Sequence, residues 1–514
     1  MQQDLLDATR LQDYEAATTK PEAPAPRASA APGILPFSYL PDEDADSVTG
    51  RAGLPLLLEA FRAYAGDVLV QQHLRLKQRA RGLSEAELVE AFLLLQASGG
   101  EHLEDFAILR EDEGLARLVG HALPSPDAAR DFLLRFHDPK LLTAACEAAK
   151  QQDEKSFVPV ESPPLAALGQ VFAELTRRMA DPKLGTVATL DHDATVIESH
   201  KQTATTHYKH GRGFQPVAVV WAEQNLIVGD EFRDGNVPAG KDNLRLIQRV
   251  FQTLPDWVTE RNFRADSACY EERVLKWLAD ALRLGGPAGP IGFTISADLT
   301  TELRARCLAV REAGATDAAP EAPRWQLLDD LRADEFVEWS EVEFTPGNWP
   351  KHAVPLRYLV VRIQKRQGGL FASGDRYKFL AVVTNRLGVG ADLLHWHWQK
   401  AGTIEHVHDE TKNGLGAGVL PCAEFGANAA WYRLVLLTYN VLTVRRREVL
   451  PPEAQRAKAK RVRFLVFNLA GKIAFHARKL YVRVKQAALA RLVVPLARAA
   501  FRQCRAAALA GATA

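Results

Sequence analysis

Hydrophobic positions between about residue 54 and residue 180 recur at steps of three and four residues, which is the period of a helix. The stretches LPLLLEAFRAYAGDVLVQQHL and LSEAELVEAFLLLQAS show this period most clearly. Ser84 with Glu87 has the pattern of a capping box, and Ser125 before Pro126 is a typical helix start. The pattern predicts an all-helical N-terminal region, either a DNA-binding domain or simply a packing domain.

The period changes from helix to strand near Lys183. TVATLDHD, FQPVAVVWA and LIVGDEFR predict three strands of an antiparallel meander. KDNLRLIQRVFQTL then predicts an amphipathic helix, and RNFRADSA predicts a fourth strand. Three strands, a helix and a strand are the order of a ribonuclease H-like α/β core. In that fold the helical crossover returns the fourth strand parallel to the first and beside it.

The remaining chain alternates between strand-like and helical patterns. PIGFTISA predicts another strand, AGATDAAPEAP a linker, and EFVEWSEVEF, LRYLVVRIQKR and YKFLAVVTN a β-rich insertion. A helix is expected over ADLLHWHWQKAGTIEHVHDETK, up to a Gly-rich end, and a second over AAWYRLVLLTYNVL.

These patterns predict an α/β protein with a ribonuclease H-like mixed sheet, in which three antiparallel strands precede parallel strands with helices. An all-helical domain precedes this core, a β-rich insertion interrupts it, and a basic helical tail follows it. The expected parts are a disordered arm, a helical DNA-binding domain, the first part of the core, the insertion, the second part of the core with a helix that carries a catalytic Glu, and the tail. Their ranges are 1–33, 34–182, 183–300, 301–378, 379–450 and 451–514.

Charge is unevenly distributed along the chain. Sixty-four Lys and Arg residues nearly balance sixty-three Asp and Glu residues, yet residues 441–514 hold seventeen Lys and Arg and two acids. A basic tail on a neutral body indicates a polyanionic partner, with DNA favoured and an anionic membrane surface as the alternative.

Other features of the composition indicate the compartment. The five cysteines lack a CxxC pair, which fits a reducing cytosol and argues against a Cys-rich zinc site. The N-terminal stretch is polar and acidic, and no apolar run reaches the roughly 18 residues of a spanning helix. We therefore expect a cytoplasmic, nucleoid-associated protein without a membrane partner.

Acidic residues gather where two of the predicted strands end. Asp191 and Asp193 lie two apart on the first strand, so both side chains share one face. Asp266 ends the fourth strand and is expected beside them. Such carboxylates suit Mg²⁺, and without a cation they would raise one another's pKa. Each also has an ordinary interpretation, as a solvated strand end or, for Asp266, as a helix N-cap.

The order of several segments resembles the DDE-type insertion-sequence transposases, in particular transposase DDE domain group one. LDHDATVIESH, GFQPVAVVW, GNVPAGKDN, RADSACY and the block that runs from WHWQKAGTIEH to VLLTYN carry the resemblance, over about residues 35–450. It implies an enzyme that cuts transposon ends and joins the 3′ hydroxyls to target DNA by divalent-metal-dependent in-line phosphoryl transfer. It also implies Mg²⁺ as cofactor, with Mn²⁺ as a substitute and two ions, double-stranded terminal inverted repeats as partners, and a homodimer on DNA.

The resemblance assigns the metal ligands. In related families the first acid sits in an Asp-x-Thr motif, which selects Asp193, and the second ends the fourth strand, which selects Asp266. The third lies in a helical Tyr–Arg–Glu–Lys signature and corresponds to Glu405. Glu410 is the rival third acid, about 140° around the helix from Glu405. Asp191 is expected to contact a metal ligand rather than the ion itself.

The same signature suggests DNA contacts. Lys412 matches its Lys, whereas Trp398 and Ala401 depart from its Tyr and Arg, and the neighbouring Lys400 can supply the missing charge. The full set of DNA-binding candidates is Lys412, Lys400, Trp398, Lys201, Lys209, Arg212, Arg445, Arg446 and Arg447.

Aromatic residues and histidines add further candidates. Trp339 and Trp349 are candidates for stacking on a flipped base, with a place on a sheet face as the alternative. The histidines around Glu405 suggest a zinc site, polar packing or DNA contact. Packing or DNA contact is favoured, because residues two apart on a helix point in different directions. These histidines are His395, His397, His406 and His408.

Two alternative functions stay open at this point. One is another ribonuclease H-like nuclease, such as a junction resolvase, and the other is a catalytically inactive DNA-binding relative.

Overall fold

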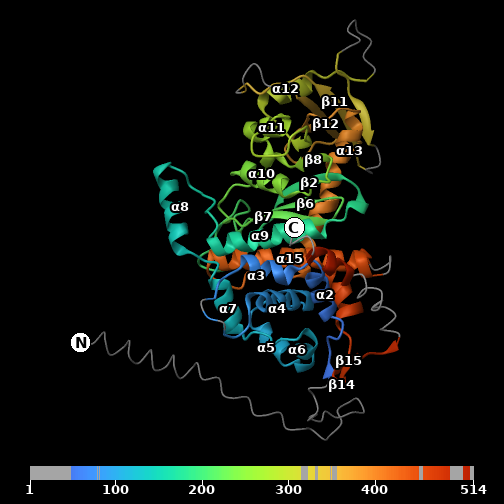
Figure 1. Ribbon diagram of the computed structural model, residues 1–514. Coiled ribbons are helices and arrows are strands. Elements are labelled where there is room, and N and C mark those ends of the chain that lie inside the picture. The colour runs from blue at the N-terminus through green and yellow to red at the C-terminus, as the bar shows by residue number, and fades with distance from the viewer. Residues whose placement is uncertain are drawn as a thin grey trace, which may run out of the picture. The chain divides into compact units, whose positions relative to one another are not determined.

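The protein was analysed as a computed structural model of the chain (Figure 1). It describes residues 48–77, 79, 81–313, 322–329, 334–347, 349, 356–450, 455–486 and 502–509. The expected arm of residues 1–33 and most of the expected linker lie outside these ranges.

Eight helices precede the sheet in the described residues, as the hydrophobic period predicts. They are α2 (Pro55–Ala63), α3 (Gly66–His73), α4 (Glu85–Ser98), α5 (Asp105–Arg110), α6 (Glu113–Val119), α7 (Pro126–Leu134), α8 (Pro139–Gln151) and α9 (Pro163–Met179). The predicted capping box is formed, because the Ser84 hydroxyl accepts from the backbone N–H of Glu87 and the Glu87 carboxylate accepts from that of Ser84. Ser125 caps α7 with Pro126 in its first turn.

The largest sheet has nine strands in the order β10-β11-β12-β13-β9-β8-β2-β6-β7. Its first part contains β2 (Val187–Ala194), β6 (Val217–Trp221), β7 (Leu226–Glu231), β8 (Glu260–Ala265) and β9 (Gly292–Ser296). Strands β2, β6 and β7 pair antiparallel, whereas β8 pairs parallel to both β2 and β9. The prediction that the fourth strand of the core returns parallel to the first and beside it is confirmed. A separate small sheet contains β3 (Ile197–Glu198), β4 (Thr205–Thr206) and β5 (Arg212–Phe214).

The β-rich stretch extends the same sheet. After helix α12 (Thr301–Ala309) come β10 (Gln326–Asp329), β11 (Glu335–Val342), β12 (Arg357–Lys365) and β13 (Tyr377–Thr384). These four strands pair antiparallel in sequence, and β13 then pairs with β9. The mixed sheet therefore continues from the core into this stretch without a break.

Helices cover both faces of the sheet (Figure 1). Helices α10 (Asn243–Thr253) and α11 (Glu272–Ala279) bury apolar residues against one face, together with Leu190 and Phe263 of the central strands. Helix α13 (Gly390–Lys400) buries Leu393 and Leu394 against β11, β12 and β13 in a third apolar cluster. The chain continues through a π-helical turn, η4 (Ala401–Glu405), into α14 (His406–Gly414).

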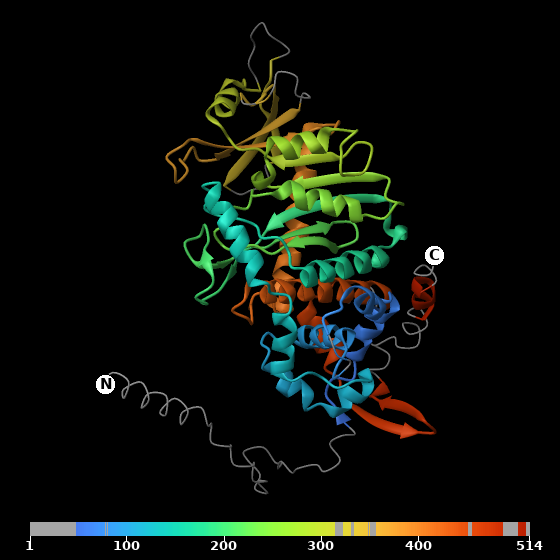
Figure 2. The same ribbon diagram turned by 60° about the vertical axis from the view of Figure 1, so that its left-hand side comes forward.

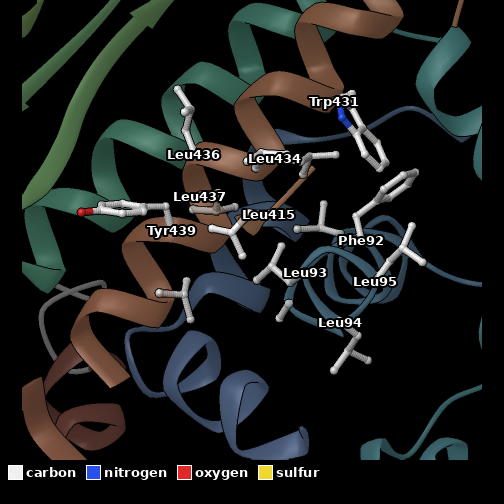
Figure 3. Close-up of a cluster of buried hydrophobic side chains, with 14 of the residues drawn as sticks. Phe92, Leu93, Leu94, Leu95, Leu415, Trp431, Leu434, Leu436, Leu437 and Tyr439 are labelled. Carbon is white, nitrogen blue, oxygen red and sulfur yellow. The ribbon is translucent and has the colours of Figure 1, made fainter. Parts of the chain in front are cut away.

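The longest helix, α15 (Phe425–Val449), runs through the largest apolar cluster. Trp431 meets Phe92 of α4 edge-on at 5.9 Å between ring centroids, and Figure 3 shows both among the leucines of this cluster. Its Asn440 side chain hydrogen-bonds the backbone N–H and carbonyl of Ile227, the second residue of β7. Helix α15 therefore joins the N-terminal helices to the edge of the sheet.

A buried ion cluster fixes α15 at the same junction. The Arg433 guanidinium lies 2.9 Å from Asp230 of β7 and 2.7 Å from Glu161, which precedes α9. Burial alone would raise the pKa of Glu161, but the charge and hydrogen bonds of Arg433, together with the charges of Arg249 and Arg245, hold that pKa below its usual range. The charged forms of Arg433, Asp230 and Glu161 therefore stabilise one another inside the protein.

The expectation of a wholly helical tail is wrong for its middle. Short helical turns α17 (Ala459–Val462) and η5 (Arg463–Phe467) are followed by a hairpin of β14 (Gly471–His476) and β15 (Lys479–Arg483). On its other edge, β14 pairs with β1 (Val48–Thr49). The apolar residues of the hairpin alternate with polar ones, and its turn places Ala477 and Arg478 at positive φ, as a two-residue hairpin turn requires. This period of two was not recognised in the sequence, because Lys and Arg residues stand between the apolar ones.

Two further features concern compartment and chemistry. All five cysteines are free thiols. Among the described helices, none combines the length and the apolar character that crossing a membrane requires.

Replacing Arg433 by Met should strongly destabilise the fold, because the buried Asp230 carboxylate would lose its ion-pair partner and the half-buried Glu161 carboxylate would keep Arg249 at 3.9 Å. We expect the free energy of unfolding, measured by urea denaturation, to fall by about 3–5 kcal/mol. The matched control is Arg177→Met, which breaks an exposed pair with Asp256 and should cost no more than about 1 kcal/mol. Equal losses in the two variants would show that the buried cluster does not hold α15 in place.

Candidate active site

Two carboxylates meet where neighbouring parallel strands end. Strands β2 and β8 pair in register up to His192 and Ala265, so the next residues along each strand are Asp193 and Asp266. Asp266 also caps a short 3₁₀ turn, since its carboxylate accepts from the backbone N–H of Ala268 at 3.1 Å. The metal-ligand and helix-cap interpretations of Asp266 are therefore compatible in geometry.

The surroundings of Asp193 disfavour its negative charge. Burial raises the pKa of Asp193, and the charge of Asp266 raises it further. The Lys400 ammonium lies 3.5 Å from Asp193 and lowers the pKa, without cancelling the rise. The strand ends thus form an acidic pair with one lysine as its counter-charge.

Asp191 is fully buried and engaged with another partner. Arg264, its register partner on β8, donates two hydrogen bonds of 2.6 and 2.8 Å to the Asp191 carboxylate. Thr403 of η4 donates a third, and Arg264 also donates to the Trp396 carbonyl of α13 at 2.6 Å. We call Asp191, Arg264 and Thr403 the clamp, because they tie the helix to the sheet.

The third expected acid lies on the π-helical turn. Turns of this kind are rare and often occur at functional sites. Glu405 ends the turn and is exposed. It lies two residues beyond Thr403, which is about 200° around an α-helix, so it points away from the clamp.

The rival acid, Glu410, has a structural role in this arrangement. Its buried carboxylate forms an ion pair with Arg446 of α15 and accepts from the backbone N–H of Ala459 at 2.8 Å. His406 lies 3.5 Å from the same carboxylate. Glu410 therefore connects α14 to α15 and α17.

No three His, Cys, Asp or Glu side chains form a metal-holding group within the described ranges. The structure brings Asp193 and Asp266 together and does not bring Glu405 to them. Two carboxylates and Lys400 are what the arrangement offers to a ligand at this edge.

Similarity to known proteins establishes the family of the chain. The sequence model of a family described as transposase DDE domain group 1 matches residues 42–505. The chain belongs to this transposase family. No curated protein matches the chain. Among solved structures, a cryo-EM structure of a piggyBac transposase synaptic complex with hairpin DNA is similar at 9% identity and a TM-score of 0.41, covering 76% of this chain and 74% of that chain. That likeness is too low to support any argument about the present protein.

In the transposase chain, one of the remaining signature residues, Lys412, contacts the segment that follows the first strand. The Lys412 ammonium donates to the Val196 carbonyl at 2.7 Å, just beyond Asp193, and burial lowers its pKa. Trp398 is 36% exposed and meets His395 edge-on. Lys400 and Lys412 thus lie on either side of the η4 turn, with both ammonium groups near the end of β2.

The histidines of this helix point to separate places. His397 is buried and hydrogen-bonds with Thr294 and Ser296 of β9. His408 is also buried, and burial lowers its pKa to about 3. With His406 on Glu410 and His395 on Trp398, the described histidines form no shared site.

Several expected DNA contacts are turned to the interior. Arg445 and Arg446 of α15 are buried, the latter on Glu410, and Arg447 donates to the Met179 carbonyl. Lys201 is half-buried and donates to the carbonyls of Leu420 and Cys422. Arg212 donates to the carbonyls of Ala204 and Gln202 but remains exposed. Lys209 is exposed. Sequence alone could not separate these groups, because all are basic and only their packing differs.

The two tryptophans have different surroundings. Trp339 is 9% exposed and lies in the apolar cluster under α13, where Gly390 leaves room for its ring. A base could reach Trp339 only if that packing opened. Trp349 is partly buried at the margin of the second core, so stacking stays a prediction for this residue.

The clamp should control the mobility of the helix that carries Glu405. Thr403→Val keeps the shape but removes the hydroxyl that donates to the buried Asp191 charge, at a cost of about 1.5–3 kcal/mol. We expect faster hydrogen exchange of the backbone amides in α13 and η4. Thr403→Ser keeps the donor and is the matched control. Unchanged exchange in Thr403→Val would show that the clamp does not hold the helix.

Proposed function

We propose that the chain is a cut-and-paste DNA transposase. It would cleave transposon ends and join their 3′ hydroxyls to target DNA. The observation that carries the proposal is the meeting of Asp193 and Asp266 at the ends of parallel strands, in a chain of the DDE family. We also propose a ribonuclease H-like core, supported by the strand order β7-β6-β2-β8-β9 and the directions of its strands.

The donor set suits a hard divalent cation. Mg²⁺ prefers oxygen ligands and is usually held by one or two carboxylates together with phosphate and water. The pKa of Asp193 is raised because this carboxylate is buried and lies beside Asp266, and a cation bound there would lower it again. When bound, two such ions would lower the pKa of the attacking water or 3′ hydroxyl and stabilise the leaving oxygen.

The protein's own groups would position the substrate. Asp193 and Asp266 would hold the ions, with Glu405 proposed as the third ligand because it is exposed, whereas Glu410 is buried on Arg446. Lys400 and Lys412 would bind phosphate oxygens near the end of β2. The clamp would hold α13 against the sheet through Arg264 and the Trp396 carbonyl, whereas the η4 turn would have to rearrange on DNA binding to bring Glu405 to the ions.

The partners follow from the same chemistry. We propose double-stranded terminal inverted repeats and target DNA as substrates, with a homodimer on the paired ends. The helical region before β2 and the basic tail would supply sequence-independent phosphate contacts. A junction resolvase would instead cut structured DNA without joining a 3′ end to a target. An inactive relative would bind the repeats without any nicking.

Asp193→Asn and Asp266→Asn should each abolish strand transfer. The assay uses pre-cleaved transposon ends, target plasmid and Mg²⁺ or Mn²⁺. We expect a loss above about 100-fold, since several kcal/mol of charge stabilisation are removed at about 1.4 kcal/mol per tenfold. The fold should persist, because Asp193 already resides where its charge is disfavoured. Wild-type rates in both variants would contradict the proposal.

Glu405→Gln and Glu410→Gln should separate catalysis from stability. Glu405→Gln should lose strand transfer and keep the wild-type unfolding midpoint, because the side chain is exposed. Glu410→Gln should lose about 3–5 kcal/mol of stability, because it leaves the Arg446 charge buried without its partner. Below its unfolding temperature, Glu410→Gln should keep activity. The reverse pattern would make Glu410 the third ligand.

A further inference from the structure

The β14–β15 hairpin has two chemically different faces. In its antiparallel register, Lys472 lies opposite Arg483, Ala474 opposite Tyr481 and His476 opposite Lys479. Directly opposed residues of a strand pair project to the same side, so these six form one basic face. We call them the ribbon face.

The opposite face is apolar. Its members come from the alternate pairs, Ile473 with Val482 and Phe475 with Leu480. Ile473 is 6% exposed and anchors the base of the hairpin against Gly114, where an added Cβ would lie 2.9 Å from its side chain. Phe475 is 74% exposed, so the apolar face is uncovered towards the turn.

Among the residues that the structure describes, the hairpin is held at its base, where Val48 and Thr49 of β1 pair with Lys472 and Gly471 of β14. In Figure 2 the hairpin, in red, projects away from the helices beside it. The remainder of both strands therefore lies open to a partner.

Charge identifies the class of partner. Residues 455–486 contain ten Lys and Arg and no Asp or Glu. The ribbon face and its surroundings expose Lys472, Arg478, Lys479, Arg483 and Lys485. Such a concentration of exposed cations without acids is complementary to a polyanion.

The geometry points to duplex DNA as the occupant: the β14–β15 hairpin is a β-ribbon arm that binds a DNA groove and its phosphates. This inference rests on the proposed function for its choice of DNA over other polyanions. A two-stranded ribbon has the width that the major groove admits. The ribbon face supplies cations and the Tyr481 hydroxyl to phosphates, and Phe475 supplies apolar contact at the tip. Because Phe475, Leu480 and Val482 leave most of the apolar face exposed, the preference for DNA over an anionic membrane surface rests on the proposed function, and the test below includes vesicles.

The test removes three charges while keeping polar side chains. The full chain carrying Lys472→Gln, Lys479→Gln and Arg483→Gln is titrated with a short labelled duplex of arbitrary sequence over a range of salt concentrations. The control carries Lys183→Gln, Arg306→Gln and Lys378→Gln, three exposed cations elsewhere on the chain. Circular dichroism and thermal unfolding verify that both variants are folded.

The expected result is a change in both affinity and salt dependence. The hairpin variant should bind about tenfold or more weakly at moderate salt, and its slope of log K against log salt should be shallower by up to about 2.7, since each phosphate contact contributes about 0.9. The control should behave as the wild type. Phe475→Ser should weaken binding without changing the slope, because it removes no charge.

Two outcomes would overturn the inference. One is a hairpin variant with the affinity and slope of the control. The other is hairpin-dependent binding of the wild type to phosphatidylserine vesicles, with duplex binding unaffected by the substitutions.

Strand transfer at saturating DNA separates this inference from the proposed function. If the wild type shows no metal-dependent strand transfer, but the hairpin variant still binds duplex DNA more weakly than the wild type, the transposase activity is refuted and the ribbon arm is supported. Active wild type with an unaffected hairpin variant would refute the ribbon arm alone.

Discussion

The parallel pairing of β2 with β8 is the constraint on which the candidate site depends. Leu190 and Phe263 are register partners and face the apolar core beneath α10 and α11. One residue further, Asp191 and Arg264 are partners on the opposite face. A slip of one residue would turn Arg264 into the apolar core and separate it from Asp191, so hydrophobic burial and the ion pair select the same register. That register also places Asp193 beside Asp266.

The clamp links the paired strands β2 and β8 to α13 and the η4 turn, which are distant from them in the sequence. Arg264 contacts Asp191, the Trp396 carbonyl and the Trp396 ring, with its guanidinium 5.0 Å from the ring centroid. Thr403 donates to the same aspartate, so one buried carboxylate receives hydrogen bonds from β8 and from the η4 turn. A buried charge of this kind is expensive unless its partners are all present. The helix with Glu405 is therefore positioned by the strand whose end carries Asp193.

The sequence was sufficient for those features that follow from local period and chain direction. The meander, the crossover and the meeting of Asp193 with Asp266 follow from strand order, because parallel strands carry their ends to one edge. The sequence did not reveal which residues far apart along the chain contact one another. Nothing near Glu410 indicates that Arg446 and the Ala459 backbone neutralise it, and nothing in the Arg445–Arg447 run distinguishes a buried guanidinium from a surface one. The hairpin was missed because its mixture of basic and apolar residues was interpreted with a helical period, although the two kinds alternate along both strands.

Burial of the arginines in α15 changes where the positive charge of the C-terminal part acts. Arg433 and Arg446 balance acids inside the protein, and burial lowers the pKa of Arg445 to about 10. Arg463 donates to the backbone carbonyls of Ala97 and Gly414. These groups stabilise packing and contribute little field outside. Since the described tail carries no acids between residues 455 and 486, its outward charge is concentrated on α17 and the hairpin. The proposed phosphate contacts of the hairpin would then add to those of Lys400 and Lys412 at the end of β2, so loss of the hairpin charges would weaken binding while leaving the two lysines in place.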